Sequence, residues 1–234
     1  MAIDPLQLRR VSVFQNATDD DLKLFTQNSV ERSIEEGEFF FFQGDSAVYF
    51  YVLISGRAKL MQMNSAGQQV NLRTINEWQM FGALGVVREN ATYPATAQAL
   101  EHSTALAIKS DFLREMMQTR PYLSFDLMKL MTGYIQEMQE RYRELATEKV
   151  ERRIAHAMLR LASQMGTKTI NGDIELSFTR QDLAEMSGTT LYTVSRVLSE
   201  WEKQGLVEAG RERVLIRRPH ELVRISEGGE SIIG

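Results

Sequence analysis

The sequence has no cysteine among its 234 residues, only 4 prolines and only 3 histidines. The absence of cysteine excludes disulfide bonds, thiolate zinc sites, cysteine-ligated iron–sulfur clusters and cysteine nucleophiles. No run approaches the ~18 uninterrupted apolar residues that a membrane-spanning helix requires. The N-terminus shows no basic segment followed by an apolar one, so no secretory signal is visible. We therefore expect a cytoplasmic protein that has no membrane partner.

The net charge of −4 is unevenly distributed along the chain. Residues 1–148 carry 14 Lys and Arg against 19 Asp and Glu, residues 149–218 carry 12 against 9, and residues 219–234 carry 1 against 3. An acidic first part and a basic second part suggest two domains with different partners. The length allows two domains of ordinary size. Chance scatter of the charges is the alternative interpretation.

Residues 30–107 have the pattern of an antiparallel β-domain. Short apolar or alternating runs, such as residues 48–54 and 58–63, are separated by glycine turns. Such short strands with frequent turns are typical of a β-barrel or β-sandwich. A helical period begins at Ser110, so the predicted fold class is α+β, with a jelly-roll-like antiparallel β-roll followed by helices.

Residues 122–147 have the spacing of one long helix with an apolar seam. The members of this seam alternate at intervals of four and three, and they are Leu127, Met131, Tyr134, Met138, Arg141 and Leu145. A second apolar stripe, Met128, Ile135 and Tyr142, repeats every seven residues. Such heptad spacing predicts a homodimer that associates along this helix. The alternative is a single helix that packs against its own core, and Arg141 on the seam would need a partner.

The most informative segment has the pattern of a helix-turn-helix. Thr179 is placed to cap a short helix, Gly188 makes a turn, and Thr190 is placed to cap a longer helix over residues 191–203. Residues 207–208 and 213–216 follow as a small wing. A hairpin with a type I′ turn at Asn171 and Gly172 is predicted before it.

The second helix of this motif would place its first turns in the major groove of DNA. Arg196 can form two hydrogen bonds to a guanine, and short hydroxyls suit phosphates. Arg180 and Arg211 flank the surface as candidate phosphate contacts. The predicted DNA-binding residues are Arg180, Thr189, Thr190, Tyr192, Thr193, Ser195, Arg196 and Arg211. An ordinary helical hairpin with a solvated polar face is the alternative.

The chain resembles the Crp/Fnr superfamily of bacterial transcription regulators over nearly its whole length. The segments that carry the resemblance are GEFFFFQGD at 37–45, FYVLISGRAKL at 50–60, FGALG at 81–85, VERRIAHAMLRLA at 150–162 and FTRQDLAEMSGTTLYTVSRVLSEWEKQGLV at 178–207. The resemblance implies a sensing β-roll (1–120), a dimerisation helix and hinge (121–148), a winged helix-turn-helix (149–225) and a flexible tail (226–234). It implies a homodimer, not an enzyme, that binds an inverted repeat in double-stranded DNA and recruits RNA polymerase.

The effector site departs from the family's cyclic-nucleotide pattern, in which a glutamate holds the ribose and an arginine pairs with the cyclic phosphate. The corresponding residues here are Gly82, Ala83 and Leu84, followed by Tyr93, Pro94 and Ala95. Since a buried phosphate without a cation is costly, we do not expect cyclic AMP to be the effector. Met138 and Gln139 stand where family members present hydroxyls to the base. Tyr192 replaces a glutamate of the family's recognition helix, so base preference should differ there.

The effector itself is not fixed by the sequence. Iron–sulfur sensing is excluded by the absence of cysteine, whereas a haem-dependent nitric-oxide or redox regulator stays open. Some segments resemble the nitrogen-oxide-responsive branch, and His102 is then the best candidate axial ligand, with a ligand-free surface histidine as the alternative. An effector-independent regulator is a further hypothesis. A cupin-like enzyme is the rival class, but the β-region holds a single histidine.

Overall fold

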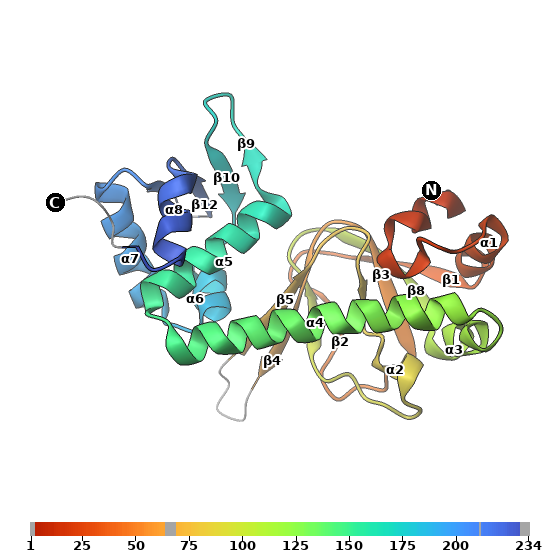
Figure 1. The fold of residues 1–234 in the computed structure, drawn as a ribbon. Helices are drawn as coiled ribbons and strands as arrows, with labels where there is room; N and C mark the ends of the chain where they lie inside the picture. The colour runs from red at the N-terminus through yellow and green to blue at the C-terminus, as the bar shows by residue number, and fades with distance from the viewer. Residues whose placement is uncertain (1–2, 64–68, 211, 230–234) are drawn as a thin grey trace. The chain divides into compact units, whose positions relative to one another are not determined.

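The computed structural model describes residues 3–63, 69–210 and 212–229. The chain divides into two compact units, Met1–Glu137 and Met138–Gly234, and the boundary lies within one long helix, α4 (Pro121–Thr147). Arg211 and residues 230–234 of the predicted tail lie outside the described residues. The elements of the two units confirm the predicted α+β class (Figure 1).

The first unit consists of short helices, an antiparallel β-roll and longer helices. Its helices are η1 (Pro5–Arg10), η2 (Ser12–Phe14), α1 (Asp19–Gln27), α2 (Leu84–Val87), α3 (Ser110–Thr119) and the first part of α4. Its strands are β1 (Ser29–Ile34), β2 (Phe39–Phe41), β3 (Tyr49–Ser55), β4 (Ala58–Met63), β5 (Gln69–Ile75), β6 (Met80–Phe81), β7 (Thr96–Ala99) and β8 (Ser103–Lys109). They form two four-stranded antiparallel sheets, ordered β1-β8-β3-β6 and β2-β7-β4-β5.

Strand β3 is buried on both faces, because it separates two apolar clusters. Successive side chains of a strand point to opposite faces. Phe50 and Val52 therefore join the cluster that packs under the helices, while Tyr51 and Leu53 join the cluster inside the roll. This double burial explains the nearly continuous apolar run of the strand.

Asp21 links the start of α1 to the region between α3 and α4. Its carboxylate accepts hydrogen bonds from the hydroxyl of Tyr122 at 2.7 Å, from Arg120 and from the backbone of Thr18, which makes a capping box with it. Burial raises the pKa of Asp21, but the hydrogen bonds from Tyr122, Thr18 and Arg120 outweigh it, so the pKa lies below its ordinary value. A carboxylate with a lowered pKa stabilises the fold above the unfolded-state pKa and loses that contribution as pH falls through the folded one.

Asp21→Asn should therefore lower the free energy of unfolding of the first unit by about 1–3 kcal/mol at pH 7. The difference between the two proteins should shrink below about pH 4, where the wild-type carboxylate becomes protonated. Urea unfolding of the wild-type protein and of Asp21→Asn at pH 7 and pH 3 measures this difference in the free energy of unfolding. An equal difference at both pH values would show that the charge of Asp21 contributes nothing.

The residues of the predicted seam on α4 differ in how far they are buried. Leu127 is buried in the core of the first unit, and Met131 packs against that core. The Tyr134 hydroxyl donates to the Met80 carbonyl at 3.3 Å, and the Arg73 guanidinium lies 3.7 Å from the centre of its ring. Leu127 is thus covered within its own unit, whereas Met131 and Tyr134 are half-buried, and a dimer contact through this seam stays a prediction.

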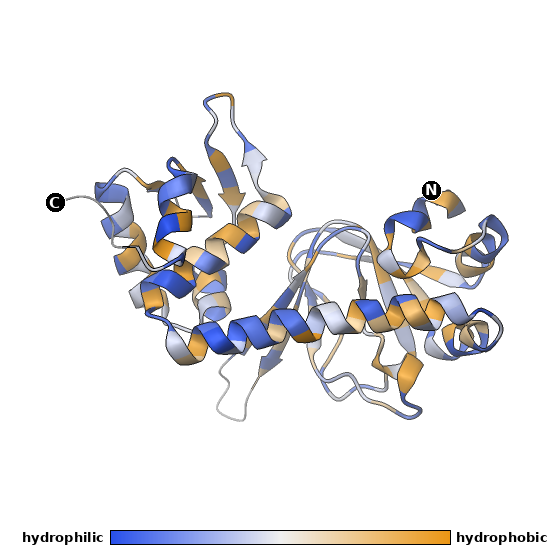
Figure 2. Cartoon of the chain, in the orientation of Figure 1, coloured by the Kyte–Doolittle hydropathy of each residue, from blue (hydrophilic) through white to orange (hydrophobic). Residues whose placement is uncertain are grey.

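The second unit carries one four-stranded sheet and a set of packed helices. Its elements are the end of α4, α5 (Val150–Met165), β9 (Thr167–Lys168), β10 (Ile174–Ser177), α6 (Arg180–Ser187), α7 (Leu191–Lys203), β11 (Val207–Ala209), β12 (Arg213–Ile216) and α8 (Pro219–Ser226). The strand order is β11-β12-β10-β9, so the predicted wing and the preceding hairpin share one sheet. Apolar positions of these helices, coloured orange in Figure 2, contribute to one hydrophobic core.

Two features of this unit differ from expectation. The hairpin between β9 and β10 does not contain a type I′ turn, because only Gly172, at φ +84°, is left-handed there. The Gly172 amide donates to the Thr169 carbonyl at 3.0 Å, which describes a type I turn closed by a left-handed glycine. Helix α8 was not predicted, and its Leu222 and Ile225 are buried in the core.

Candidate DNA interface and effector site

Helices α6 and α7 form the predicted helix-turn-helix. The Thr179 hydroxyl accepts from the Asp182 amide at 3.0 Å and forms a capping box that begins α6. Gly188 ends α6 in the left-handed conformation, at φ +62°. The Thr190 hydroxyl then accepts from the Thr193 amide at 3.2 Å and begins α7. Local capping rules thus set the ends of both helices.

The two faces of α7 differ sharply in burial. Its inner face, Val194, Val197, Leu198 and Trp201, is buried in the core of the unit. Tyr192 is 80% exposed, and Arg196 and Thr190 are exposed as well. Thr189, Thr193, Ser195 and Arg180 are half-buried. Among the predicted contact residues, Thr190, Tyr192 and Arg196 are thus exposed in the first turns of α7, and Arg211 lies outside the described residues.

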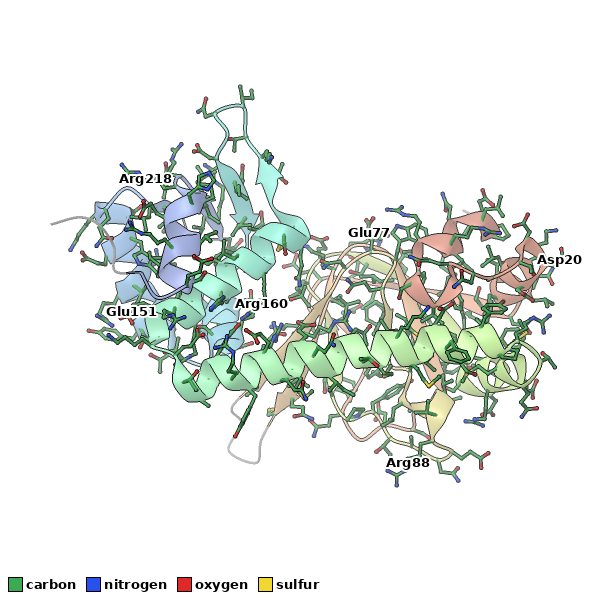
Figure 3. All side chains as sticks on the ribbon, in the orientation of Figure 1. Asp20, Glu77, Arg88, Glu151, Arg160 and Arg218 are labelled. Atoms are coloured by element: carbon green, nitrogen blue, oxygen red, sulfur yellow. The ribbon has the colours of Figure 1, made fainter. Side chains whose placement is uncertain are left out.

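Arg196 has an acidic neighbour that the sequence pattern did not indicate. Its guanidinium lies 3.6 Å from the carboxylate of Glu151 in the first turn of α5, and 60% of its side chain is exposed (Figure 3 labels Glu151). An exposed ion pair of this kind contributes little free energy. Arg196 therefore stays available to a base or a phosphate. Leu191, 48% exposed at the start of α7, is a further accessible residue that the sequence analysis missed.

Tyr93 fills part of the interior of the β-roll. Its ring stacks on Phe41, with ring centres 3.7 Å apart and planes 16° from parallel, and only 3% of the residue is exposed. The hydroxyl donates to the Tyr49 carbonyl at 2.6 Å. Burial raises the pKa of Tyr93, so the group stays neutral. An uncharged, packed phenol offers a phosphate no counter-ion.

The other candidate effector residues are divided between the two units, and those of the first unit include Gly82 beside Phe41 and Tyr93. Gly82 has φ +72°, and a Cβ there would lie 3.1 Å from Phe41 and 3.2 Å from Tyr93. Ala83 and Ala95 are buried, whereas Leu84 and Pro94 are exposed. Met138 and Gln139 are exposed on the part of α4 that belongs to the second unit. Within the first unit, aromatic side chains therefore occupy the space beside Gly82.

His102 does not have the surroundings of a haem ligand. Its side chain is 58% exposed, its Nδ1 lies 3.0 Å from a Glu35 carboxylate oxygen, and its Nε2 lies 3.3 Å from the Ser33 hydroxyl. A haem ligand needs a free ring nitrogen inside an apolar pocket. In the described part of the chain, no group of three ligating side chains could hold a metal ion either.

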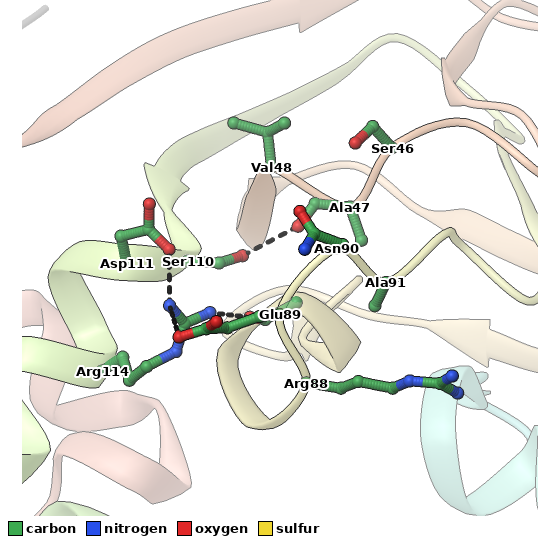
Figure 4. A pocket seen from close by; sticks show the side chains of 11 residues that line it. Ser46, Ala47, Val48, Arg88, Glu89, Asn90, Ala91, Ser110, Asp111 and Arg114 are labelled. Carbon is green, nitrogen blue, oxygen red and sulfur yellow. Dashed lines mark hydrogen bonds and ion pairs between the residues drawn. The ribbon is translucent and has the colours of Figure 1, made fainter.

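A polar surface pocket of about 320 Å³ lies between α2, the loop after it and the start of α3. Arg114 points into it and donates to the Gly85 carbonyl at 2.5 Å and to Asp111 at 2.8 Å, as Figure 4 shows. Arg88 extends away from these groups (Figure 4). Because the polar groups of Arg114 already have protein partners, this pocket is not a strong candidate for the effector.

Two family models match the chain, one in each of its compact units. Residues 31–120 match the cyclic nucleotide-binding domain, and residues 152–225 match the Crp-like helix-turn-helix domain. None of the helices in the described ranges is both long and apolar enough to cross a membrane.

Characterised relatives and solved structures agree with this assignment. The chain is 28% identical over 198 residues to the transcriptional activator protein anr of Pseudomonas aeruginosa, covering 84% of this chain and 80% of the relative. It is 26% identical to the cyclic AMP receptor protein of Thermus thermophilus, covering 92% and 97% of the two chains. The structure of FixK2 from Bradyrhizobium japonicum has a similar fold, with a TM-score of 0.75 at 18% identity, covering 86% of this chain and 99% of that one.

A cyclic nucleotide-binding-like β-roll followed by a helix-turn-helix with an accessible second helix defines the Crp/Fnr-type class of DNA-binding transcription regulators. The chain belongs to the Crp/Fnr superfamily.

Proposed function

We propose that the protein is a homodimeric, sequence-specific regulator that binds an inverted-repeat operator. The observation that carries this proposal is the start of α7, where Tyr192 and Arg196 are exposed beside the hydroxyls of Thr190 and Thr193. A helix N-terminus with short hydroxyls suits phosphate, and an exposed arginine suits a guanine edge. DNA is therefore the partner that this surface fits.

The dimer contact is proposed for the second stripe of α4. Met128, Ile135 and Tyr142 are 54%, 57% and 74% exposed, at the heptad spacing that two helices need to associate. Large apolar side chains exposed in such a row mark an interaction surface. Of the seam that the sequence suggested, Met138 and Leu145 are also exposed, and Arg141 is half-buried.

The effector is proposed not to be cyclic AMP, because Ala83 and Tyr93 stand where the family's acid and cation would be. Neither residue can hold the ribose or the phosphate of a cyclic nucleotide, and Tyr93 is packed against Phe41. The similarity to the cyclic AMP receptor protein of Thermus thermophilus therefore does not imply that this chain binds cyclic AMP. Recruitment of RNA polymerase and the absence of a catalytic role are proposed from the family membership, as is a cytoplasmic location.

Footprinting on an operator fragment tests this proposal. We expect two protected half-sites about 10–10.5 bp apart, centre to centre, since each subunit places one α7 in the major groove. Ile135→Glu should abolish the paired protection, because a carboxylate replaces an apolar contact between the helices.

Ile170→Glu is the matched control, because Ile170 is fully exposed in the turn of the β9–β10 hairpin and is not part of α4. It should leave the paired footprint unchanged. A single unrepeated half-site for the wild-type protein would contradict the inverted repeat, and an unchanged footprint in Ile135→Glu would contradict the proposed dimer stripe.

A further inference from the structure

Arg153, in the first turns of α5, contacts the end of α4 and the turn of the helix-turn-helix at the same time. Its Nε donates to the Ser187 carbonyl at 2.9 Å, its Nη1 to the Glu148 carbonyl at 2.9 Å, and its Nη2 to the Gly188 carbonyl at 3.3 Å. Each guanidinium nitrogen therefore has a backbone acceptor. Two of these acceptors lie at the end of α6, and the third directly follows α4.

These acceptors are chemically suited to a guanidinium. The last carbonyls of a helix have no partner within the helix and carry the negative end of its dipole. A planar guanidinium offers several donors in a fixed geometry, so that one side chain can satisfy carbonyls from two helices. Lysine has a single ammonium and cannot reproduce this arrangement. Arg153 therefore acts as a common cap for the ends of α4 and α6.

The carbonyls that Arg153 holds lie directly before α7. After Gly188, only Thr189 precedes Thr190, whose hydroxyl caps α7. The Thr189 amide donates back to the Ala184 carbonyl at 3.0 Å, so the turn has little freedom of its own. A Cβ at Gly188 would collide with the side chain of Leu145, which shows that α4 and the turn are in close contact. The position of this turn sets the position of the proposed DNA contacts.

The end of α4 is itself anchored to α5 by two buried carboxylates, Glu144 and Glu148, whose partners on α5 are Arg160 and His156. The Glu148 side chain is 1% exposed and lies 3.0 Å from Arg143 and 3.3 Å from His156. Glu144 lies 2.6 Å from Arg160 (labelled in Figure 3). Breaking buried pairs of this kind is costly. The last turns of α4, the start of α5 and the turn therefore form one connected body within the second unit.

We infer that Arg153 is a positioning residue for operator recognition, through which the end of α4 fixes the start of α7. It contacts backbone rather than DNA, so it acts on base readout through the turn. This inference rests on the proposed function, because it presupposes that α7 reads an operator.

Arg153→Gln tests the inference in the full-length protein, with affinities for operator and for unrelated DNA measured at several salt concentrations. We expect operator affinity to fall about tenfold or more, since charge-assisted hydrogen bonds to two helix ends are lost. Affinity for unrelated DNA and the slope of log affinity against log salt should stay at wild-type values, because no phosphate contact is removed. Hydrogen exchange at the amides of residues 189–193 should become faster.

Arg152→Gln is the matched control. Arg152 caps another helix end, donating to the Ser226 carbonyl at 3.1 and 3.0 Å at the end of α8. Its guanidinium also lies 3.7 Å from the Glu148 carboxylate, so the two arginines share this neighbour and differ in that Arg153 donates to the carbonyls of the turn. It should lower the thermal unfolding midpoint without changing the ratio of operator to unrelated affinity. Arg153→Lys keeps the charge but should show the same fall in the ratio of operator affinity to unrelated-DNA affinity. It replaces Arg153→Gln in the test if that variant does not fold.

If both Arg153 variants kept the wild-type ratio of operator affinity to unrelated-DNA affinity, the inference would be overturned. A salt slope reduced by about one would overturn it too, since Arg153 would then be a phosphate contact. If the wild-type protein shows no preference for any operator, the proposed function has failed. That result can be told apart from both outcomes above, because they concern the Arg153 variants only.

Discussion

Replacing Tyr93 by alanine is expected to lower the free energy of unfolding of the first unit by about 3–5 kcal/mol, the range for large aromatic residues in a core. The ring is packed between Phe41 and the other aromatic residues of the roll, and its hydroxyl has a backbone acceptor on Tyr49. Truncation removes both and leaves a cavity. Urea unfolding monitored by the signal of the first unit gives the measurement.

Tyr192→Ala provides the control for residue type, because Tyr192 is 80% exposed and lies in the other unit. Its effect on unfolding should stay within about 0.5 kcal/mol. Tyr93→Ala should not gain affinity for cyclic AMP, since the cavity still lacks a cation. A free energy of unfolding within about 0.5 kcal/mol of wild type in Tyr93→Ala would contradict the view that this ring is a major part of the core of the roll.

Arg196→Ala is expected to reduce the preference for operator over unrelated DNA about 5- to 150-fold, the range for losing one good bidentate contact to a base. Binding to unrelated DNA should persist with its salt dependence, because that binding depends on phosphate contacts. Binding measured on both DNAs at several salt concentrations gives the ratio.

Arg196→Lys is the control for charge. A lysine keeps the positive charge but cannot form the paired hydrogen bonds, so it should lose discrimination while keeping the salt slope. Equal losses on every DNA sequence in Arg196→Ala would contradict base readout, and they would assign Arg196 to a phosphate.

Helices α6 and α7 could be predicted from the sequence because their starts, and the end of α6, depend on local chemistry. Thr179 and Thr190 cap α6 and α7, and Gly188 takes the left-handed conformation that ends α6. Such signals involve residues a few positions apart, so they are visible in a sequence. The Asn171 and Gly172 pair was less informative, because a left-handed glycine suits more than one hairpin turn.

Burial on α4 could not be predicted, because two apolar stripes at helical spacing are equivalent in a sequence. Packing in the first unit decides that Leu127 is buried while Ile135 is exposed. That Tyr93 stands in place of the family's arginine is a prediction from the resemblance. That its ring fills the roll depended on residues distant in sequence, above all Phe41.

The contacts of Arg153 had no sequence signal at all. Its acceptors are main-chain carbonyls 34 and 35 residues away, in addition to the carbonyl of Glu148. Every residue has a main-chain carbonyl, so the residue types do not reveal which carbonyls will accept from Arg153. Only the tertiary fold determines it. The same holds for the burial of Glu144 and Glu148, which depends on the packing of the end of α4 against α5.

Selection of bound duplexes from a random DNA library with the purified protein tests the central claim most directly. We predict one enriched motif, an inverted repeat with half-sites about one helical turn apart, enriched without added cyclic AMP or to the same extent with it. A library that emerges with no enriched sequence would contradict the assignment of the α7 surface as an operator-reading site.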